Sequence, residues 1–396
     1  MVTQQVKRMM LLLLLAGMLF LGNVLSAENN VADKNKDGKK KTIDLVFAID
    51  VSGSMDHIIT AAQKKVWAIV NQMASVKPMP SLRIGLIAYR GQNEECFGGT
   101  GFKCWDLSEN LDLVYKQLMS LSTDGGATEC VGRAIYEATN SMSWDKSKDG
   151  LKVLFVLGNE PANQDPDQEK YGYKKVASDA IKQNISINTV YCAQGAEGAT
   201  PEWKEIAALS DGAFSTISLE GRVVEIATPM DKEIVLLNGK LNNTYMAYGA
   251  RGRKSMELQQ SMDSAANSVS GSAAPAGGLA ERAVAKSGNA YRSGDWDLVD
   301  RSKDKDFKME DVKDEELPDE MKKMSMEERK AYIEKKIKER EEVQKQIREL
   351  GEKREQYIKE EMKKQKLVGD EFDQVIMKTL REQAEKKGFE FEKEKK

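Results

Sequence analysis

Three polar residues follow the end of one apolar segment, and their side chains suit hard metal ions. The apolar run 45–49 stops at Asp50, and Ser52 and Ser54 come next at alternate positions. Alternate residues of a tight loop point to one side, and Gly53 lets the backbone turn where a side chain would crowd it. One carboxylate and two hydroxyls suit Mg²⁺, Mn²⁺ or Ca²⁺, with water completing the coordination. A metal-free helix cap made of the same residue types is the alternative.

The elements that would position these residues are alternating apolar segments and helical patterns over residues 43–220. Continuous apolar strands between helices are typical of parallel strands covered on both faces. The pattern therefore predicts a doubly wound α/β domain with a mostly parallel, Rossmann-like sheet. Ligands of such domains bind at the carboxyl ends of the strands, where Asp50 and Asn159 stand. The expected strands are 43–50, 82–89, 151–158, 185–192 and, more weakly, 213–218, and the expected helices are 57–76, 110–121, 129–143, 167–183 and 201–210.

The stretch DLVFAIDVSGSM and the alternating pattern after it, from residue 43 to about 220, resemble a von Willebrand factor type A (VWA) domain. In that family, D-x-S-x-S is the first part of a metal-ion-dependent adhesion site. The resemblance implies that Asp50, Ser52 and Ser54 surround a divalent cation, Mg²⁺ before Mn²⁺ or Ca²⁺. It also implies a protein-interaction module, in which the carboxylate of a protein partner fills an open coordination position.

The rest of such a site departs from the family pattern. The family's second piece is a Thr in a Gly-rich loop. The loop itself matches Thr128 to that position, whereas counting back from the following helix matches Glu129. The third piece is an Asp after the fourth strand, but Asn159 stands there and supplies a neutral oxygen. Either Glu129 restores the lost negative charge, or the site is degenerate and binds metal weakly.

Other classes of function find little support in the sequence. The net charge of −3 gives no overall basic field for nucleic acid. His57 is the one histidine of the chain, and it follows Asp56 at a helix start. The chain has no G-x-S-x-G elbow, P-loop or HExxH motif. We therefore expect a protein that is not an enzyme.

The N-terminus has the pattern of a secretory signal peptide. Lys7 and Arg8 form a positive region, an apolar run covers 9–21, and small residues end at Ala27. We therefore expect residues 1–27 to be cleaved, leaving a secreted or periplasmic protein with no stable membrane anchor. A polar linker would cover 28–42.

Export changes the interpretation of the four cysteines, because disulfides form in an oxidising compartment. Cys96 and Cys104 bracket a glycine-bearing loop and could form a local bridge. Cys130 and Cys192 would then form the second pair, with two buried thiols as the alternative.

The region after residue 220 is expected to be mainly helical and increasingly charged. A helical segment, 221–267, would pack on the VWA domain and lead through a flexible linker, 268–280, to an irregular segment, 281–324. A charged helical region would fill 325–396. With this extension, the chain is similar to secreted or periplasmic bacterial VWA proteins.

The long helix from residue 325 has a thin heptad stripe that includes Ile333 and Ile347 but also Arg340 and Arg354. It could form a weak coiled coil, an antiparallel hairpin with 370–388, or a helix lying on the main domain. These helices would oligomerise the chain or dock it. The alternative function is a structural, envelope-organising protein that acts through them with a degenerate metal site.

Overall fold

The computed structural model describes residues 40–91, 101–123, 128–193, 201–219, 223–365 and 371–391. A six-stranded sheet with the order β3-β2-β1-β4-β5-β6 lies at its centre. All neighbouring strands are parallel except β2 and β3. The predicted doubly wound, mostly parallel fold is thus confirmed. The strands are β1 (Thr42–Asp50), β2 (Ser81–Tyr89), β3 (Phe102–Ser108), β4 (Leu151–Gly158), β5 (Ser186–Ala193) and β6 (Phe214–Ser218).

Strand β3 is the one strand that the sequence did not predict. It lies at an edge of the sheet, pairs only with β2 among the described strands, and is mostly half-buried or exposed. An edge strand of this kind lacks the continuous apolar run that marks the buried parallel strands. The five predicted strands, by contrast, all form close to their expected positions.

The strand order places a switch point between β1 and β4. From β1 the chain adds β2 and then β3 on one side, and afterwards adds β4, β5 and β6 on the other side. The carboxyl ends of β1 and β4 therefore flank the crevice in which doubly wound domains bind their ligands. Asp50 ends β1, and Asn159 follows the last residue of β4.

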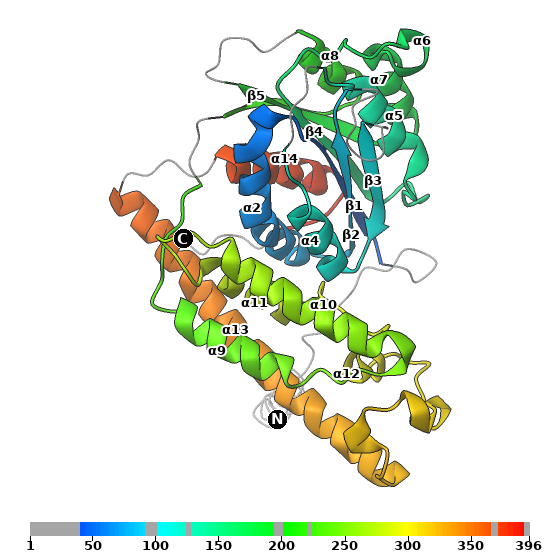
Figure 1. Ribbon diagram of the computed structural model, residues 1–396, viewed down its shortest axis with the longest axis vertical. Helices are drawn as coiled ribbons and strands as arrows, with labels where there is room; N and C mark the ends of the chain where they lie inside the picture. Colours follow the sequence, from blue (N-terminus) through cyan, green and yellow to red (C-terminus); the bar gives the residue numbers. More distant parts are fainter. Residues whose placement is uncertain are drawn as a thin grey trace, which may run out of the picture.

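Helices cover both faces of the sheet (Figure 1). Alternate residues of β1 point to opposite faces. Val46 and Ala48 join one core cluster, which includes residues of α5, α7 and α8, and Leu45 and Phe47 join the other, which includes residues of α2, α4 and α14. The helices are α2 (Asp56–Ala74, after the turn η1, Gly53–Met55), α4 (Leu111–Met119), α5 (Val131–Ser141), α6 (Gln168–Tyr171), α7 (Tyr173–Lys182), α8 (Pro201–Leu209) and α14 (Glu371–Lys386).

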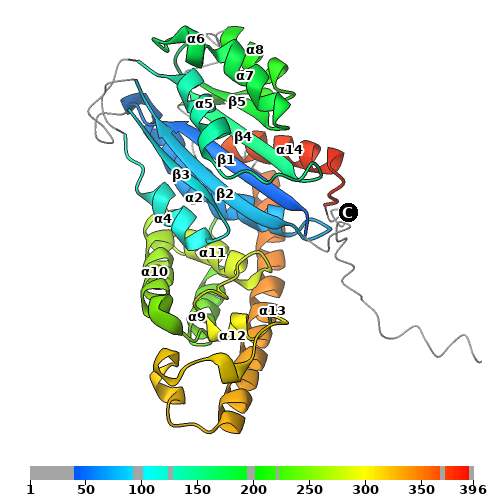
Figure 2. The same cartoon turned by 90° about the vertical axis from the view of Figure 1, so that its right-hand side faces the viewer.

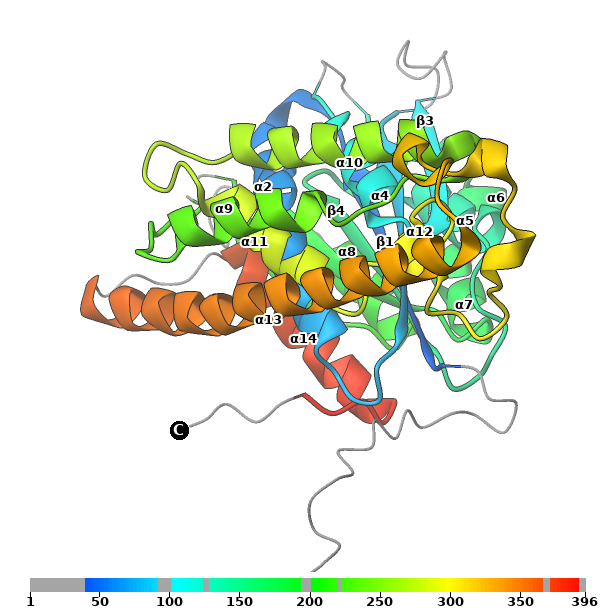
Figure 3. The same ribbon diagram turned by 90° about the horizontal axis from the view of Figure 1, so that it is seen from below.

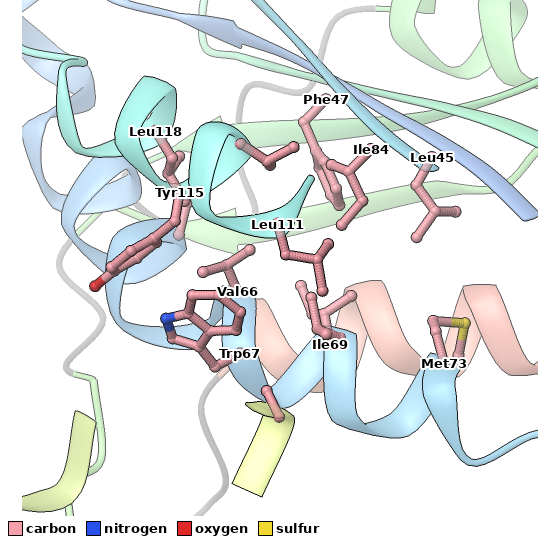
Figure 4. Packing of buried hydrophobic residues seen from close by; sticks show 14 of the residues in the cluster. Leu45, Phe47, Val66, Trp67, Ile69, Met73, Ile84, Leu111, Tyr115 and Leu118 are labelled. Atoms are coloured by element: carbon pink, nitrogen blue, oxygen red, sulfur yellow. The ribbon is translucent and has the colours of Figure 1, made fainter. Parts of the chain in front are cut away.

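Helix α2 follows the Asp50 loop and is buried along one side. Figure 4 shows Ile69 and Met73 of α2 beneath Leu45 and Phe47 of β1. The indole of Trp67, which precedes these residues in α2, packs on Tyr115 of α4 with ring centroids 5.0 Å apart. The loop with Ser52 and Ser54 is therefore anchored at both ends by elements of the core.

A second layer of helices covers α2 and α4 (Figure 2). Helix α11 packs on α2, α10 packs on α4 and α11, and the long helix α13 lies across α9 and α11 (Figure 3). The apolar core is continuous across these layers, since Leu241 and Ile347 belong to the same cluster as Leu45. The elements of this layer are α9 (Asp231–Asn242), α10 (Gly249–Ser268), α11 (Gly277–Ser287), α12 (Leu298–Arg301), η2 (Met309–Asp311), η3 (Asp314–Glu316), η4 (Asp319–Met321) and α13 (Met326–Gln365).

The region 268–324 is more ordered than the sequence indicated. Helix α11 begins inside the predicted linker and continues into the predicted irregular segment. Its start is rich in small residues, which suggested flexibility but serve close packing. A Cβ on Gly278 would lie 2.4 Å from the carbonyl oxygen of Ala266, so glycine lets α11 approach the end of α10.

The two C-terminal helices pack on different parts of the molecule. Along α13, Arg340 pairs with Asp297 at 2.5 Å, and Arg354 pairs with Asp231 at 2.8 Å. The arginines that interrupt the heptad stripe therefore face protein partners. Helix α13 packs mainly on α9 and α11 of the helical layer, and not on the main domain as in the third alternative. Helix α14 instead packs on α2 and β6, with Leu380 fully buried.

Several expectations about the termini and cysteines meet the limits of the described residues. The predicted signal peptide, 1–27, and Cys96 lie outside them. Cys104 and Cys192 carry free thiols, so the expected Cys130–Cys192 bridge is absent. The Cys192 thiol instead faces the carbonyl oxygen of Val190 at 3.7 Å. Within the described part, no helix combines the length and apolarity needed to cross a membrane.

Candidate functional site

The carboxylate of Asp50 is completely buried at the end of β1 and is held by the loop that follows. The backbone N–H of Ser52 donates to Asp50 Oδ1 at 2.8 Å, and the Ser52 hydroxyl donates to Oδ2 at 2.9 Å. The hydroxyls of Ser52 and Ser54 are 3.1 Å apart. Since Ser54 is exposed, this row of oxygens runs from the interior to the surface.

Asn159 joins the same row from the end of β4. Its Nδ2 donates to the hydroxyl of Ser54 at 2.9 Å. Its Oδ1 is buried, and no described residue donates a hydrogen bond to it. The amide therefore brings a neutral acceptor oxygen to the position where the family pattern has the carboxylate of an Asp.

Glu129 reaches this cluster from the segment before α5. Glu129 is 2% exposed, and its carboxyl group contacts Asp50 and Ser52. Its Oε2 is buried without a hydrogen-bond partner among the described residues. The structure thus brings together Asp50, Ser52, Ser54, Glu129 and Asn159, and Thr128 stands at an exposed position directly before Glu129.

Two buried carboxyl groups in contact have unusual protonation. Burial and then the nearby charge of Asp50 raise the pKa of Glu129 well above its usual range. Burial also raises the pKa of Asp50 against the opposing effect of its hydrogen bonds. The pair therefore retains a proton where isolated carboxyl groups would be ionised. A cation bound at this place would replace that proton, because metal-binding carboxylates must be deprotonated.

Sequence reasoning missed two residues that support the site, Gln164 and Asp165. The side-chain oxygen of Gln164 accepts a hydrogen bond from the N–H of Glu129 at 2.7 Å. Asp165 is 3% exposed and accepts hydrogen bonds from the N–H groups of Gly132 and Arg133 at 2.8 and 2.9 Å. Both follow Asn159 in a polar loop, and no local pattern distinguishes them there.

The donor set is made of hard oxygens. In the portion of the chain that the structure describes, no group of three or more His, Cys, Asp and Glu side chains could hold a metal ion. The five-residue cluster contains only two such side chains, Asp50 and Glu129, and its other members supply hydroxyl and amide oxygens. Two carboxyls with such oxygens match the preference of Mg²⁺, Mn²⁺ and Ca²⁺ rather than that of soft metals.

Similar solved structures include a form of proximal thread matrix protein 1 from the mussel byssus, described as having a zinc-occupied MIDAS motif. It is 13% identical, with a TM-score of 0.36, over 46% of this chain and 42% of that one. The SpRpn10 VWA domain is 16% identical, with a TM-score of 0.35, over 46% of this chain and 90% of that one. A von Willebrand factor type A protein from Catenulispora acidiphila is also 16% identical, with a TM-score of 0.34, over 45% of this chain and 39% of that one.

The sequence comparisons give a more direct result. No curated protein matches the chain. The family model of the von Willebrand factor type A domain, a class of protein-interaction module, matches residues 44–226. That range contains all five residues of the cluster and the six strands of the sheet, apart from the first two residues of β1. Residues 44–226 of this chain are therefore a von Willebrand factor type A domain.

Proposed function

We propose that this protein binds a protein partner through a divalent cation held at the carboxyl ends of β1 and β4. One observation carries the proposal. Glu129 Oε2 and Asn159 Oδ1 are buried without hydrogen-bond partners among the described residues, and both side chains border the oxygens of Asp50, Ser52 and Ser54. Leaving such a group unsatisfied costs about 1–3 kcal/mol. A cation would satisfy both oxygens at once.

The charge of the site supports the same proposal. Asn159 contributes no charge, but Glu129 adds a second carboxylate beside Asp50. Two carboxylates balance one divalent cation, and Mg²⁺ is the ion that we expect first, with Mn²⁺ and Ca²⁺ as alternatives. Because Ser54 is exposed, the open coordination position would face solvent. A partner's carboxylate could occupy that position.

Calorimetric titration of residues 28–396 with Mg²⁺, Mn²⁺ and Ca²⁺ tests the cation. We expect saturable binding that Asp50→Ala abolishes and Glu129→Ala weakens. Asp149→Asn is the control, because it removes an exposed carboxylate that lies before the amino end of β4, away from the cluster. Absence of any heat of binding in the wild type, or equal binding by Asp50→Ala, would refute the proposal.

The partner's chemistry is tested separately on the Mn²⁺-loaded protein. An oligoglutamate peptide should bind, whereas an oligoglutamine peptide of equal length should not, since an amide cannot supply a charged ligand. EDTA should abolish the binding. Equal binding of both peptides would contradict recognition of a carboxylate.

Export is part of the proposal and rests on residues 1–27 alone. Lys7 and Arg8 precede an apolar run that is too short for a full membrane span. Expression of the whole chain in a secreting host should yield protein that begins near Glu28, as measured by intact mass. Retention of residues 1–27 in the purified protein would argue against cleavage.

A further inference from the structure

We propose that Asp165 is a positioning residue that holds Glu129 against Asp50. This inference rests on the proposed function, because it concerns the same cation site. Glu129 lies just before Cys130, the N-cap of α5, so any shift of the start of this helix moves the Glu129 carboxyl group. Asp165 is the residue that fixes the start of α5.

Helix α5 does not cap itself. Its N-cap, Cys130, makes no side-chain capping hydrogen bond, and its first turn contains no acidic residue. Asp165, from the loop after β4, accepts hydrogen bonds from the N–H groups of Gly132 and Arg133 instead. The Cys130 thiol also bonds to the Asp165 carboxylate. One buried side chain thus supplies both the cap and the negative charge that favours a helix N-terminus.

The first turn of α5 packs closely against the segment that follows β4. A Cβ on Gly132 would lie 1.8 Å from the carbonyl oxygen of Tyr171, so the first turn of α5 lies against the backbone at the end of α6. The side-chain oxygen of Gln164 accepts a hydrogen bond from the N–H of Glu129 at 2.7 Å. Gln164 and Asp165, which are neighbours in one loop, therefore form hydrogen bonds with the backbone on both sides of Cys130.

The same loop begins with Asn159, which donates to Ser54. The hydrogen bonds of Gln164 and Asp165 therefore set the position of Glu129 relative to the β4 side of the site. Such a constraint is needed, because two buried carboxyl groups repel each other once both are ionised. Without it, we expect Glu129 to move away from Asp50 and the cation to lose one ligand.

The experiment measures Mg²⁺ and Mn²⁺ affinity by calorimetry and unfolding temperature for four variants of residues 28–396. Asp165→Ala removes both hydrogen bonds to the first turn of α5, and Asp165→Asn retains one acceptor oxygen. Asn110→Ala removes the side-chain cap of α4, where Asn110 accepts a hydrogen bond from the N–H of Leu113 at 3.0 Å. Leu380→Ala loosens the core at α14. The last two report the effects of a lost cap and of lost stability.

We expect Asp165→Ala to weaken cation affinity by about 10- to 100-fold, as outer-shell partners of metal ligands do. Asp165→Asn should lose less, and Asn110→Ala and Leu380→Ala should bind as the wild type does. If Asp165→Ala does not fold, the intermediate loss in Asp165→Asn carries the test. Wild-type affinity in both Asp165 variants, or an equal loss in Leu380→Ala, would overturn the positioning role alone. A wild type that binds no cation would overturn the proposed function with it.

Discussion

At the residue scale, the molecule brings the carboxyl groups of Asp50 and Glu129 together, near the neutral amide of Asn159. Asp50 and Glu129 are both buried and in contact, and the pKa of each is raised. Without a cation, this arrangement is unfavourable for folding. A site that is strained when empty and relieved by its ligand is typical of functional residues rather than of a helix cap.

Glu129→Gln should stabilise the cation-free protein and weaken cation binding. The amide mimics the protonated carboxyl group and, unlike Glu129, does not have to take up a proton when the chain folds. We expect a gain in the free energy of unfolding of at least about 1 kcal/mol near pH 8, since one unit of pKa shift corresponds to about 1.4 kcal/mol. Urea unfolding in EDTA measures it. A loss of stability in this variant would show that Glu129 is ionised and favourably paired.

The same pair predicts a pH dependence. A raised pKa means that the folded protein binds more protons than the unfolded chain above the usual pKa of Glu129, 4.5. Its contribution to stability therefore falls as the pH rises above that value. In EDTA, the wild type should lose more stability than Glu129→Gln between pH 5 and pH 8. Parallel curves for the two proteins would contradict this protonation.

At the element scale, helix α14 completes the core of the VWA domain although it follows the matched range 44–226 by a long stretch of chain. Ile376, Leu380 and Ala384 are fully buried against the layer that contains α2. Asn188 of β5 and Gln383 of α14 exchange two side-chain hydrogen bonds at 2.9 and 3.0 Å. The domain is therefore incomplete without the end of the chain.

Leu380→Ala should lower the free energy of unfolding by about 2–5 kcal/mol, as Leu to Ala changes in cores do. Lys378→Ala, at an exposed position of the same helix, is the control and should change it by less than about 0.5 kcal/mol. Urea unfolding followed by circular dichroism distinguishes them. Similar stabilities of the two variants would mean that α14 is not part of the cooperative core.

A buried ionic cluster joins the helical layer to the VWA domain. Asp263 of α10 pairs with Arg282 and Lys286 of α11 at 2.7 and 2.9 Å, and Arg282 also pairs with Asp112 of α4 at 2.7 Å. Burial alone would raise the pKa of Asp263, but Lys286 and Arg282 outweigh it and hold the pKa below its usual range. The cluster is therefore expected to remain charged at neutral pH.

Asp263→Ala should cost about 3–5 kcal/mol of unfolding free energy at pH 7, because it leaves buried cations without their partner. Glu257→Ala, on an exposed position of α10, is the control. The lowered pKa means that the Asp263 contribution is present above pH 4 and is lost as the pH falls below it. Acid unfolding curves of the two variants should therefore converge at low pH. A constant gap down to pH 2 would contradict this.

At the scale of the whole molecule, one continuous apolar core joins the sheet that carries the Asp50 cluster to the helical layer. Removal of residues 300–396 would take α14 off the VWA domain, so such a deletion cannot separate the roles of the two regions. Single substitutions at the site and in the helices can. A bound cation should also stabilise the entire chain, by about 2.7 kcal/mol at a hundred times its dissociation constant.

Sequence reasoning predicted the parts of this molecule that local pattern determines. The run that ends at Asp50 identified β1, the switch-point loop and the hydroxyls of Ser52 and Ser54. It left the register of Thr128 and Glu129 open, because the position of Glu129 depends on a contact with Gln164, which lies far along the chain. It also could not place α14 or recognise α11, since both depend on contacts between segments far apart in the chain.

The most direct test of the account is a crystal structure of residues 28–396 grown with MnCl₂ and measured for the anomalous signal of manganese. We predict one peak that is coordinated by Ser52 and Ser54 and lies within ligand distance of Glu129 Oε2 and Asn159 Oδ1, with Asp50 beside it. Crystals of Glu129→Ala grown under the same conditions should show a weaker manganese peak or none. No manganese in the wild type, or manganese bound elsewhere while Glu129 still contacts a protonated Asp50, would contradict the account.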